Sequence, residues 1–130
     1  MNLCYTLPDQ EAALLKPLRE GQPIRYCVPY DLDDDGAFCG DGWIAVTERA
    51  LFILKNGTLK HCVPLAETDE VVCTSQVDCG ILAARRDGRD QYLCRFSMRH
   101  MIRVSYTARG ATLFCKGDNR PVESREREKT

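Results

Sequence analysis

The stretch GWIAVTERALFILKNGTLKHCVPL, residues 42–65, decides the fold, because it predicts three short strands joined by two tight turns. Asn56-Gly57 separates the apolar run at 51–54 from residues 58–63. Asn-Gly is the pair that best accepts the positive φ angles of a type I′ hairpin turn. An antiparallel meander is therefore expected here. No set of catalytic residues accompanies it, so the stretch predicts architecture and not chemistry.

Strand signals continue on both sides of this stretch, where runs rich in branched and aromatic residues are separated by glycine-containing turns. The seven expected strands cover residues 24–30, 43–47, 51–54, 59–63, 71–76, 81–85 and 92–96. The turns between them are expected to contain Asp35-Gly36, Asn56-Gly57, Cys79-Gly80 and Asp87-Gly88.

Two helices are expected to frame these strands. Thr6 stands before Pro8 and Asp9 in the manner of a capped helix start, which predicts a helix from residue 8 to about residue 16. After residue 96 the apolar spacing changes to three and four residues, which is typical of a terminal helix. The expected apolar face of that helix holds Met98, Met101, Ile102, Ser105, Ala108 and Thr112, with a left-handed C-cap at Gly117.

Composition narrows the class of protein. The 130 residues are 44% hydrophobic, which predicts one globular domain with a real core. The apolar runs are far shorter than the roughly 18 residues that a membrane span needs, and no signal peptide is recognisable, so a soluble, cytoplasmic chain is expected. The formal net charge is −1, and no cluster of basic residues in the sequence is large enough to indicate nucleic-acid binding.

Eight cysteines are scattered through the chain without a C-x-x-C pair, the spacing that places two thiolates on one zinc ion. Most lie among apolar, strand-like residues, where a free cysteine acts as a small hydrophobe. No disulfide framework, cofactor or metal is therefore expected from them. One nucleophilic cysteine stays open as an alternative, although no position is distinguished.

Seven antiparallel strands followed by one helix resemble the layout of a pleckstrin-homology-like (PH-like) domain. The expected fold is mainly β: a PH-like seven-stranded antiparallel bent sandwich or barrel, capped by one C-terminal α-helix and preceded by a short N-terminal helix. The expected organisation is an N-terminal helical extension at 1–21, the PH-like domain at 22–117 and a charged linker or tail at 118–130. That tail alternates charges and has too few apolar residues to bury a face.

Several motifs carry a closer resemblance. WIAVTERALF, residues 43–52, resembles the signature of bacterial PH-like and GRAM-like domains, and Val63-Pro64-Leu65 resembles the strand end that follows it. CRFSMRH at 94–100, YTARG at 106–110 and VESREREKT at 122–130, together with YCVPYDL at 26–32, resemble the N-terminal cytosolic domain of ABC transporter ATP-binding/permease proteins from Gram-positive anaerobic bacteria.

This resemblance implies a non-catalytic accessory or regulatory domain at the cytosolic face of the cell membrane. Its partners would be other regions of the same transporter polypeptide or a partner protein. In those proteins the tail leads into a zinc-ribbon-like segment and then the transmembrane and nucleotide-binding regions. The chain has no G-x-x-x-x-G-K-[ST] phosphate loop, so this part is expected neither to bind nor to hydrolyse ATP.

Asp31, Asp33 and Asp35 form the one local metal candidate, because D-x-D-x-D-G opens an EF-hand calcium loop. The rest of that loop is missing. Position twelve is Gly42 instead of a bidentate glutamate, and the preceding residues are strand-like where a helix is required. An acidic, solvated connection between the first two strands is the favoured interpretation.

Arginines supply the candidate interaction surface. Three surround the Asp87-Gly88 turn and two lie on the terminal helix, where contact with anionic lipid at a membrane surface is the alternative function. The five are Arg85, Arg86, Arg89, Arg99 and Arg103. The first strand connection, where PH domains often bind head groups, holds five aspartates and would repel them.

Catalysis is not expected. His61 and His100 are the only histidines, with His61 expected opposite Phe52 and His100 in the first turn of the terminal helix. Neither spacing suggests an acid–histidine–nucleophile set. Protein interaction through a sheet edge, or through the groove beside the terminal helix, is the function that remains.

Overall fold

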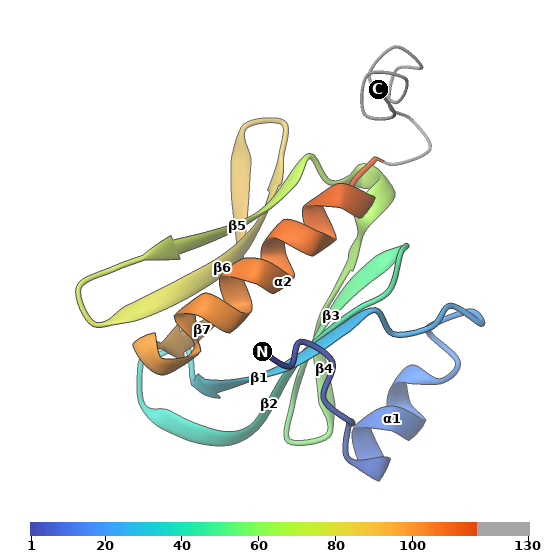
Figure 1. Cartoon of the computed structure of the whole chain (residues 1–130), viewed down its shortest axis with the longest axis horizontal. Coiled ribbons are helices and arrows are strands. Elements are labelled where there is room, and N and C mark those ends of the chain that lie inside the picture. Colours follow the sequence, from blue (N-terminus) through green and yellow to red (C-terminus); the bar gives the residue numbers. More distant parts are fainter. Residues whose placement is uncertain (117–130) are drawn as a thin grey trace.

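The computed structural model describes residues 1–116. Its seven antiparallel strands form one open sheet, with a long helix after the last strand and a short helix before the first (Figure 1). The strands are β1 (Tyr26–Leu32), β2 (Phe38–Val46), β3 (Ala50–Lys55), β4 (Thr58–Pro64), β5 (Glu70–Ser75), β6 (Cys79–Arg86) and β7 (Arg89–Ser97). The helices are α1 (Asp9–Leu15) and α2 (Met101–Phe114), and the 3₁₀ turns η1 (Leu65–Glu67) and η2 (Met98–His100) precede β5 and α2. The mainly β class and all seven expected strands are confirmed.

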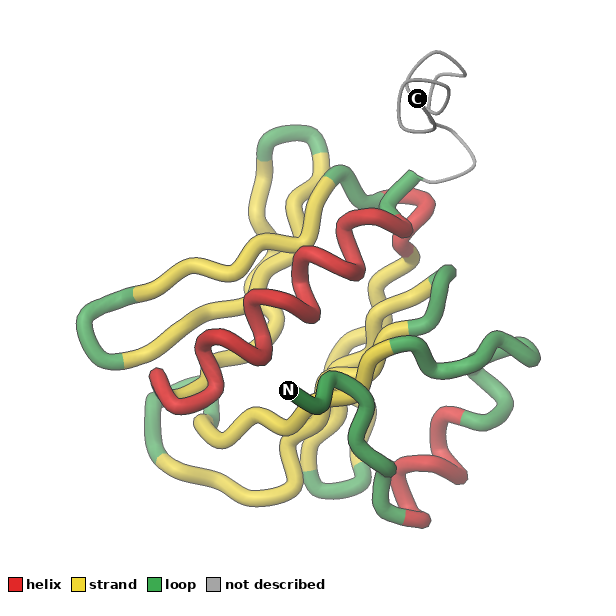
Figure 2. The backbone as a smooth tube through the Cα atoms, in the orientation of Figure 1, coloured by secondary structure: helices red, strands yellow, loops and turns green. Residues whose placement is uncertain are grey.

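The sheet consists of two meanders, β1 to β4 and β5 to β7, in the order β4-β3-β2-β1-β7-β6-β5. One registered pair, Leu32 with Arg95, joins them. Figure 2 shows α2 lying across the sheet, and β5 is the element with which it makes the most extensive contact. This order leaves β4 and β5 as the two edges of the sheet, with α2 beside only one of them.

The N-terminal segment pairs with the half of β1 that β7 does not reach. The Cys27 N–H donates to the Leu3 carbonyl at 2.9 Å, and the Tyr5 N–H donates to the Cys27 carbonyl at 2.7 Å. This makes a single parallel bridge between Cys4 and Cys27. The backbone groups of β1 that would otherwise lack partners are thereby satisfied.

Turn chemistry explains two of the hairpins. Asn56 and Gly57 have φ angles of 51° and 73°, and Asp87 and Gly88 have 53° and 77°, so both pairs adopt the positive φ values of a type I′ turn. The Cys79-Gly80 turn was a wrong expectation, because both residues belong to β6. Gly80 is needed there for close packing: a Cβ at this position would lie 2.2 Å from Cε2 of Phe96.

The helix ends and faces also differ from expectation. Thr6 does not cap α1: the residue before the helix is Pro8, and no side chain caps it. The carboxylate of buried Glu11 instead accepts a hydrogen bond from the Gly57 N–H at 3.1 Å, which fixes α1 over the β3–β4 turn.

The expected apolar face of α2 was wrong in part. The buried residues are Val104, Thr107, Ala108, Gly110 and Ala111, whereas Ile102 is 65% exposed. Hydrophobic spacing did not identify this face because small and polar residues occupy much of it, and Gly110, for example, packs closely against the Tyr26 ring of β1. The expected C-cap at Gly117 and the tail at 118–130 lie outside the described residues.

Two hydrophobic clusters hold the sheet. One lies between the sheet and α2 and includes Phe96 and Val104. The other includes Phe52 on β3, Ala45 on β2 and Leu15 of α1. Phe52 and Phe96 are both fully buried, so each cluster contains one fully buried phenylalanine, and the cluster around Phe96 draws residues from both meanders.

Candidate functional site

The acidic β1–β2 connection directs its carboxylates to different partners. Asp31 accepts hydrogen bonds from the N–H and Oγ of Ser97, at 2.8 and 2.6 Å. Asp33 accepts from the N–H groups of Asp35 and Ala37, each at 2.9 Å, and these bonds hold the pKa of Asp33 below its usual value. Two of the three carboxylates that the D-x-D-x-D-G pattern would bring to one ion, those of Asp31 and Asp33, therefore bind β7 and the loop itself. Within residues 1–116 no three His, Cys, Asp or Glu side chains are placed to hold a metal ion.

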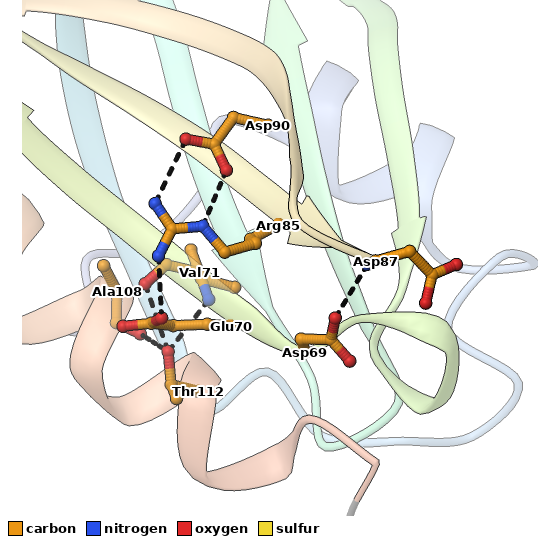
Figure 3. A network of polar contacts seen from close by, with 8 residues as sticks. All are labelled: Asp69, Glu70, Val71, Arg85, Asp87, Asp90, Ala108 and Thr112. Atoms are coloured by element: carbon orange, nitrogen blue, oxygen red, sulfur yellow. Dashed lines mark hydrogen bonds and ion pairs between the residues drawn. The ribbon is translucent and has the colours of Figure 1, made fainter.

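Arg85 and Arg86, next to the β6–β7 turn, lie among carboxylates, and Figure 3 shows those around Arg85. Arg85 pairs with Asp90 at 2.8 Å and with Glu70 at 3.3 Å. Arg86 pairs with Glu67 at 3.2 Å. These contacts neutralise two of the three arginines, and the Arg85 guanidinium lowers the pKa of Asp90.

An open cavity of about 570 Å³ lies beside this turn, between the end of β4 and the start of β7. Arg86 and Arg89 line it together with the carboxylates of Glu67, Asp87 and Asp90. Arg89 has no ion pair with any residue in 1–116. The mixture of positive and negative side chains makes this a poor site for anionic head groups.

The two arginines expected on the terminal helix lie far from that turn, at the other end of the sheet (Figure 1). The Arg103 guanidinium lies 5.3 Å from the Tyr5 ring centroid, and its Nη1 lies 2.9 Å from Nδ1 of His100. Arg99 is exposed on η2. The structure thus divides the five predicted arginines between two separate places.

Asp31, Ser97 and His100 form a polar junction between β1, β7 and the start of α2. Asp31 Oδ2 lies 2.6 Å from the Ser97 hydroxyl and 3.6 Å from His100 Nε2. In a catalytic triad the histidine stands between the serine and the acid; here the acid stands between the other two. Burial lowers the pKa of His100, so the imidazole is neutral at pH 7. The arrangement supports a structural role.

The expected position of His61 opposite Phe52 was wrong. His61 pairs with Ile53, and Phe52 pairs with Cys62. The register shift next to Ile53 inserts Lys60 as an extra residue on β4, and a bulge of this kind moves every later pair by one. The turn sequence alone gave no signal of it.

The β5 edge and α2 form the groove that best suits an interaction site. The Val71 N–H donates to Thr112 Oγ1 at 2.9 Å, and that hydroxyl lies 3.1 Å from the Val71 carbonyl and 2.9 Å from that of Ala108 (Figure 3). The Thr112 hydroxyl therefore satisfies the outward N–H of Val71, and its single proton is shared between the carbonyls of Ala108 and Val71. Farther along, β5 and α2 diverge toward the β5–β6 turn (Figure 1).

Two residues of β5 after Val71 have backbone N–H and C=O groups that are available for pairing with another strand. Backbone groups of a strand alternate in direction, so Cys73 and Ser75 face the same side as Val71, away from β6. No backbone partner takes them among residues 1–116. Cys73 also lines a cavity of about 240 Å³ with Ser105, Ala108 and Arg109 of α2. The sequence predicted interaction through a sheet edge or a groove beside the terminal helix without naming residues. The residues at the corresponding place in the structure are Cys73 and Ser75 of β5 and the cavity-lining residues of α2.

All eight cysteines are free, and Cys27, Cys79, Cys94 and Cys115 are buried. Burial raises the pKa of Cys27 to about 12, and burial is also the main cause of the raised pKa of Cys94. Both therefore stay protonated thiols, the less nucleophilic form.

No protein-family model matches the chain, and the search of curated proteins finds no match either. The resemblance to transporter domains accordingly stays a prediction. None of the helices in residues 1–116 has the length and apolar character needed to cross a membrane.

Proposed function

We propose that this chain is a non-catalytic, PH-like interaction module that serves as an accessory or regulatory domain of an ABC-type transporter. It binds another region of the same polypeptide, or a partner protein, at the cytosolic face of the membrane. The open edge of β5 beside α2 carries this proposal. The seven antiparallel strands and the helix that follows them support the PH-like part of the proposal.

An extended partner segment adds to the sheet next to β5. The N–H and C=O groups of Cys73 and Ser75 pair with its backbone, as in other cases of strand addition. Side chains of the segment enter the cavity between β5 and α2, which gives the contact its selectivity. The N–H of Val71 is already bonded to the Thr112 hydroxyl, so the added strand pairs with β5 only after Val71.

Charge favours this protein-binding role over the alternative of anionic-lipid binding. Arg85 and Arg86 are paired with carboxylates, and Arg103 is turned toward Tyr5 and His100. A bilayer approaching the β6–β7 turn would meet about as many negative as positive groups.

A proline at Ser75 tests the contact, because it removes an outward N–H without touching the bonds to β6. Ser75→Ala keeps the N–H and is the matched control. A photo-cross-linking residue at exposed Thr74 of the full-length native protein reports the partner by mass spectrometry. We expect the cross-linked product in the parent and in Ser75→Ala, and its loss in Ser75→Pro at an unchanged Tm. Equal cross-linking in all three would refute the edge as the binding site.

The transporter assignment has a separate test in the coding sequence after Thr130. A cysteine-rich segment followed by membrane spans and a phosphate loop would support it. A stop codon would leave a free-standing interaction module. If it is a transporter, removal of residues 1–117 is expected to change ATPase activity or export, and unchanged values would exclude a regulatory role.

A further inference from the structure

The outward face of α2 departs from the pattern of a surface helix. Such helices normally place polar side chains toward solvent. Here Met98, Ile102 and Tyr106, each four residues from the next, are 47%, 65% and 46% exposed. They form a row of about 12 Å along the η2–α2 segment, at 1.5 Å per helical residue. This row, Met98-Ile102-Tyr106, is called the outer row below.

Within the η2–α2 segment that carries the outer row, the acidic and basic side chains are all of one sign. Residues 96–116 contain three arginines and one lysine and no Asp or Glu. Arg109 lies with its guanidinium 5.2 Å from the Tyr106 ring centroid, and Arg99 is exposed one residue after Met98. Tyrosine, methionine and arginine are the types enriched at protein interfaces, where lysine is depleted.

We propose that the outer row is a docking surface for an amphipathic helix of a protein partner whose apolar stripe is flanked by Asp or Glu. A row of residues at four-residue spacing matches the ridge that one helix presents to the groove of another. The carboxylates of the partner pair with Arg99 and Arg109 at the rim. Arg109 also lines the cavity beside β5, but none of the three outer-row residues does, and the proposal does not depend on strand addition at that edge.

Other occupants fit less well. Residues 117–130 hold a single aliphatic side chain, Val122, and cannot supply an apolar stripe. A second copy of the chain would bring the arginines of two α2 helices together, with like charges opposed. A flat anionic bilayer would also meet the β1–β2 connection and the β5–β6 turn beside the start of α2, which carry Asp33, Asp34, Asp35 and Asp78 (Figure 1).

A phage-display library of helix-forming peptides with randomised surface positions, selected on the 130-residue chain, is the probe. We expect enriched peptides to carry apolar residues at three- and four-residue spacing, flanked by Asp or Glu. Ile102→Glu should weaken their binding at least about tenfold, as loss of an interface anchor does. Val77→Glu places the same charge at another exposed apolar residue and should leave binding unchanged.

Charge reversal gives the second measurement. Arg99→Glu and Arg109→Glu should weaken the acidic peptides and reduce the salt dependence of binding. Ser75→Pro should leave their binding intact, so failure here and failure at the β5 edge are separable. No enrichment, enrichment of basic peptides, or equal binding to Ile102→Glu would overturn the proposal. So would Ile102-dependent sedimentation with vesicles of equal parts phosphatidylcholine and phosphatidylserine, which would indicate a membrane surface instead.

Discussion

The two edges of the sheet are protected in different ways. On β4 the protection is local: a bulge at Lys60 interrupts the edge, a lysine stands at that bulge, and Pro64 ends the strand without an N–H. β5 has no proline, lysine or bulge. Within residues 1–116, its outward backbone is hydrogen-bonded by Thr112 of α2, 41 residues after Val71 in the chain. An edge protected by its own residues is closed permanently, whereas an edge covered by another element can accept a partner.

The largest expected effect tests whether both edges belong to one cooperative unit. Phe96→Ala and Phe52→Ala each remove a fully buried aromatic side chain, one from each hydrophobic cluster, and each should cost about 3–5 kcal/mol. Because one continuous sheet joins the two meanders, denaturant unfolding should give one transition by Trp43 fluorescence and by circular dichroism. Separate transitions in Phe96→Ala would show that the β5 half unfolds alone.

Thr112→Val removes the contact that distinguishes the β5 edge. The valine keeps the volume but leaves the Val71 N–H without a partner, at an expected cost of about 1–3 kcal/mol. Hydrogen exchange should become faster at Val71 and stay unchanged along β4. Thr112→Ser retains the hydroxyl and should behave like the parent. Faster exchange at both edges would contradict an independent cover for β5.

A smaller effect is expected from pH through His100, which lies just before α2. Burial lowers the pKa of its imidazole below the ordinary 6.5, against the opposing effect of Asp31. The unfolded chain therefore binds the proton first. Stability should be full above pH 6.5 and fall as the pH drops from there through the folded-state pKa. His100→Gln should flatten this part of the curve of unfolding free energy against pH, and an unaltered slope would assign it to other groups.

The smallest effect on stability, within about 0.5 kcal/mol, is expected for Lys60→Val on exposed β4. The substitution is expected to increase self-association of the protein, because a lysine at a sheet edge opposes pairing with another chain. Sedimentation velocity should show more dimer for Lys60→Val than for Lys60→Arg. Equal association would mean that the bulge and Pro64 protect β4 without the lysine.

Features fixed by neighbouring residues could be predicted from the sequence. Asn56-Gly57 and Asp87-Gly88 determine their own turns, since the required φ angles depend on the two residues themselves. Cys79-Gly80 has similar turn chemistry but lies inside β6, because Gly80 is selected by contact with Phe96. A glycine in the sequence does not show whether a turn or a neighbour requires it.

The candidate site depends on residues that are distant in the chain, which is why its geometry was not predictable. Thr112 meets Val71 across 41 residues, and Asp31 meets Ser97 across 66. All five arginines are exposed or partly exposed, but nothing in the sequence indicated their partners, such as Glu70 and Asp90 for Arg85 or Glu67 for Arg86. The residue types alone predict where the positive charges lie along the chain. The fold is needed to show which of these charges are neutralised by carboxylates.

The late position of Thr112 has a consequence for the folding of the chain during synthesis. Val71 leaves the ribosome 41 residues before the hydroxyl that covers it. At roughly 5–20 residues per second, the β5 edge stays uncovered for several seconds in every new chain. Through that interval β5 is the strand most able to pair with a neighbouring nascent chain, and the risk of misassembly depends on the rate of elongation as well as on the stability of the folded domain.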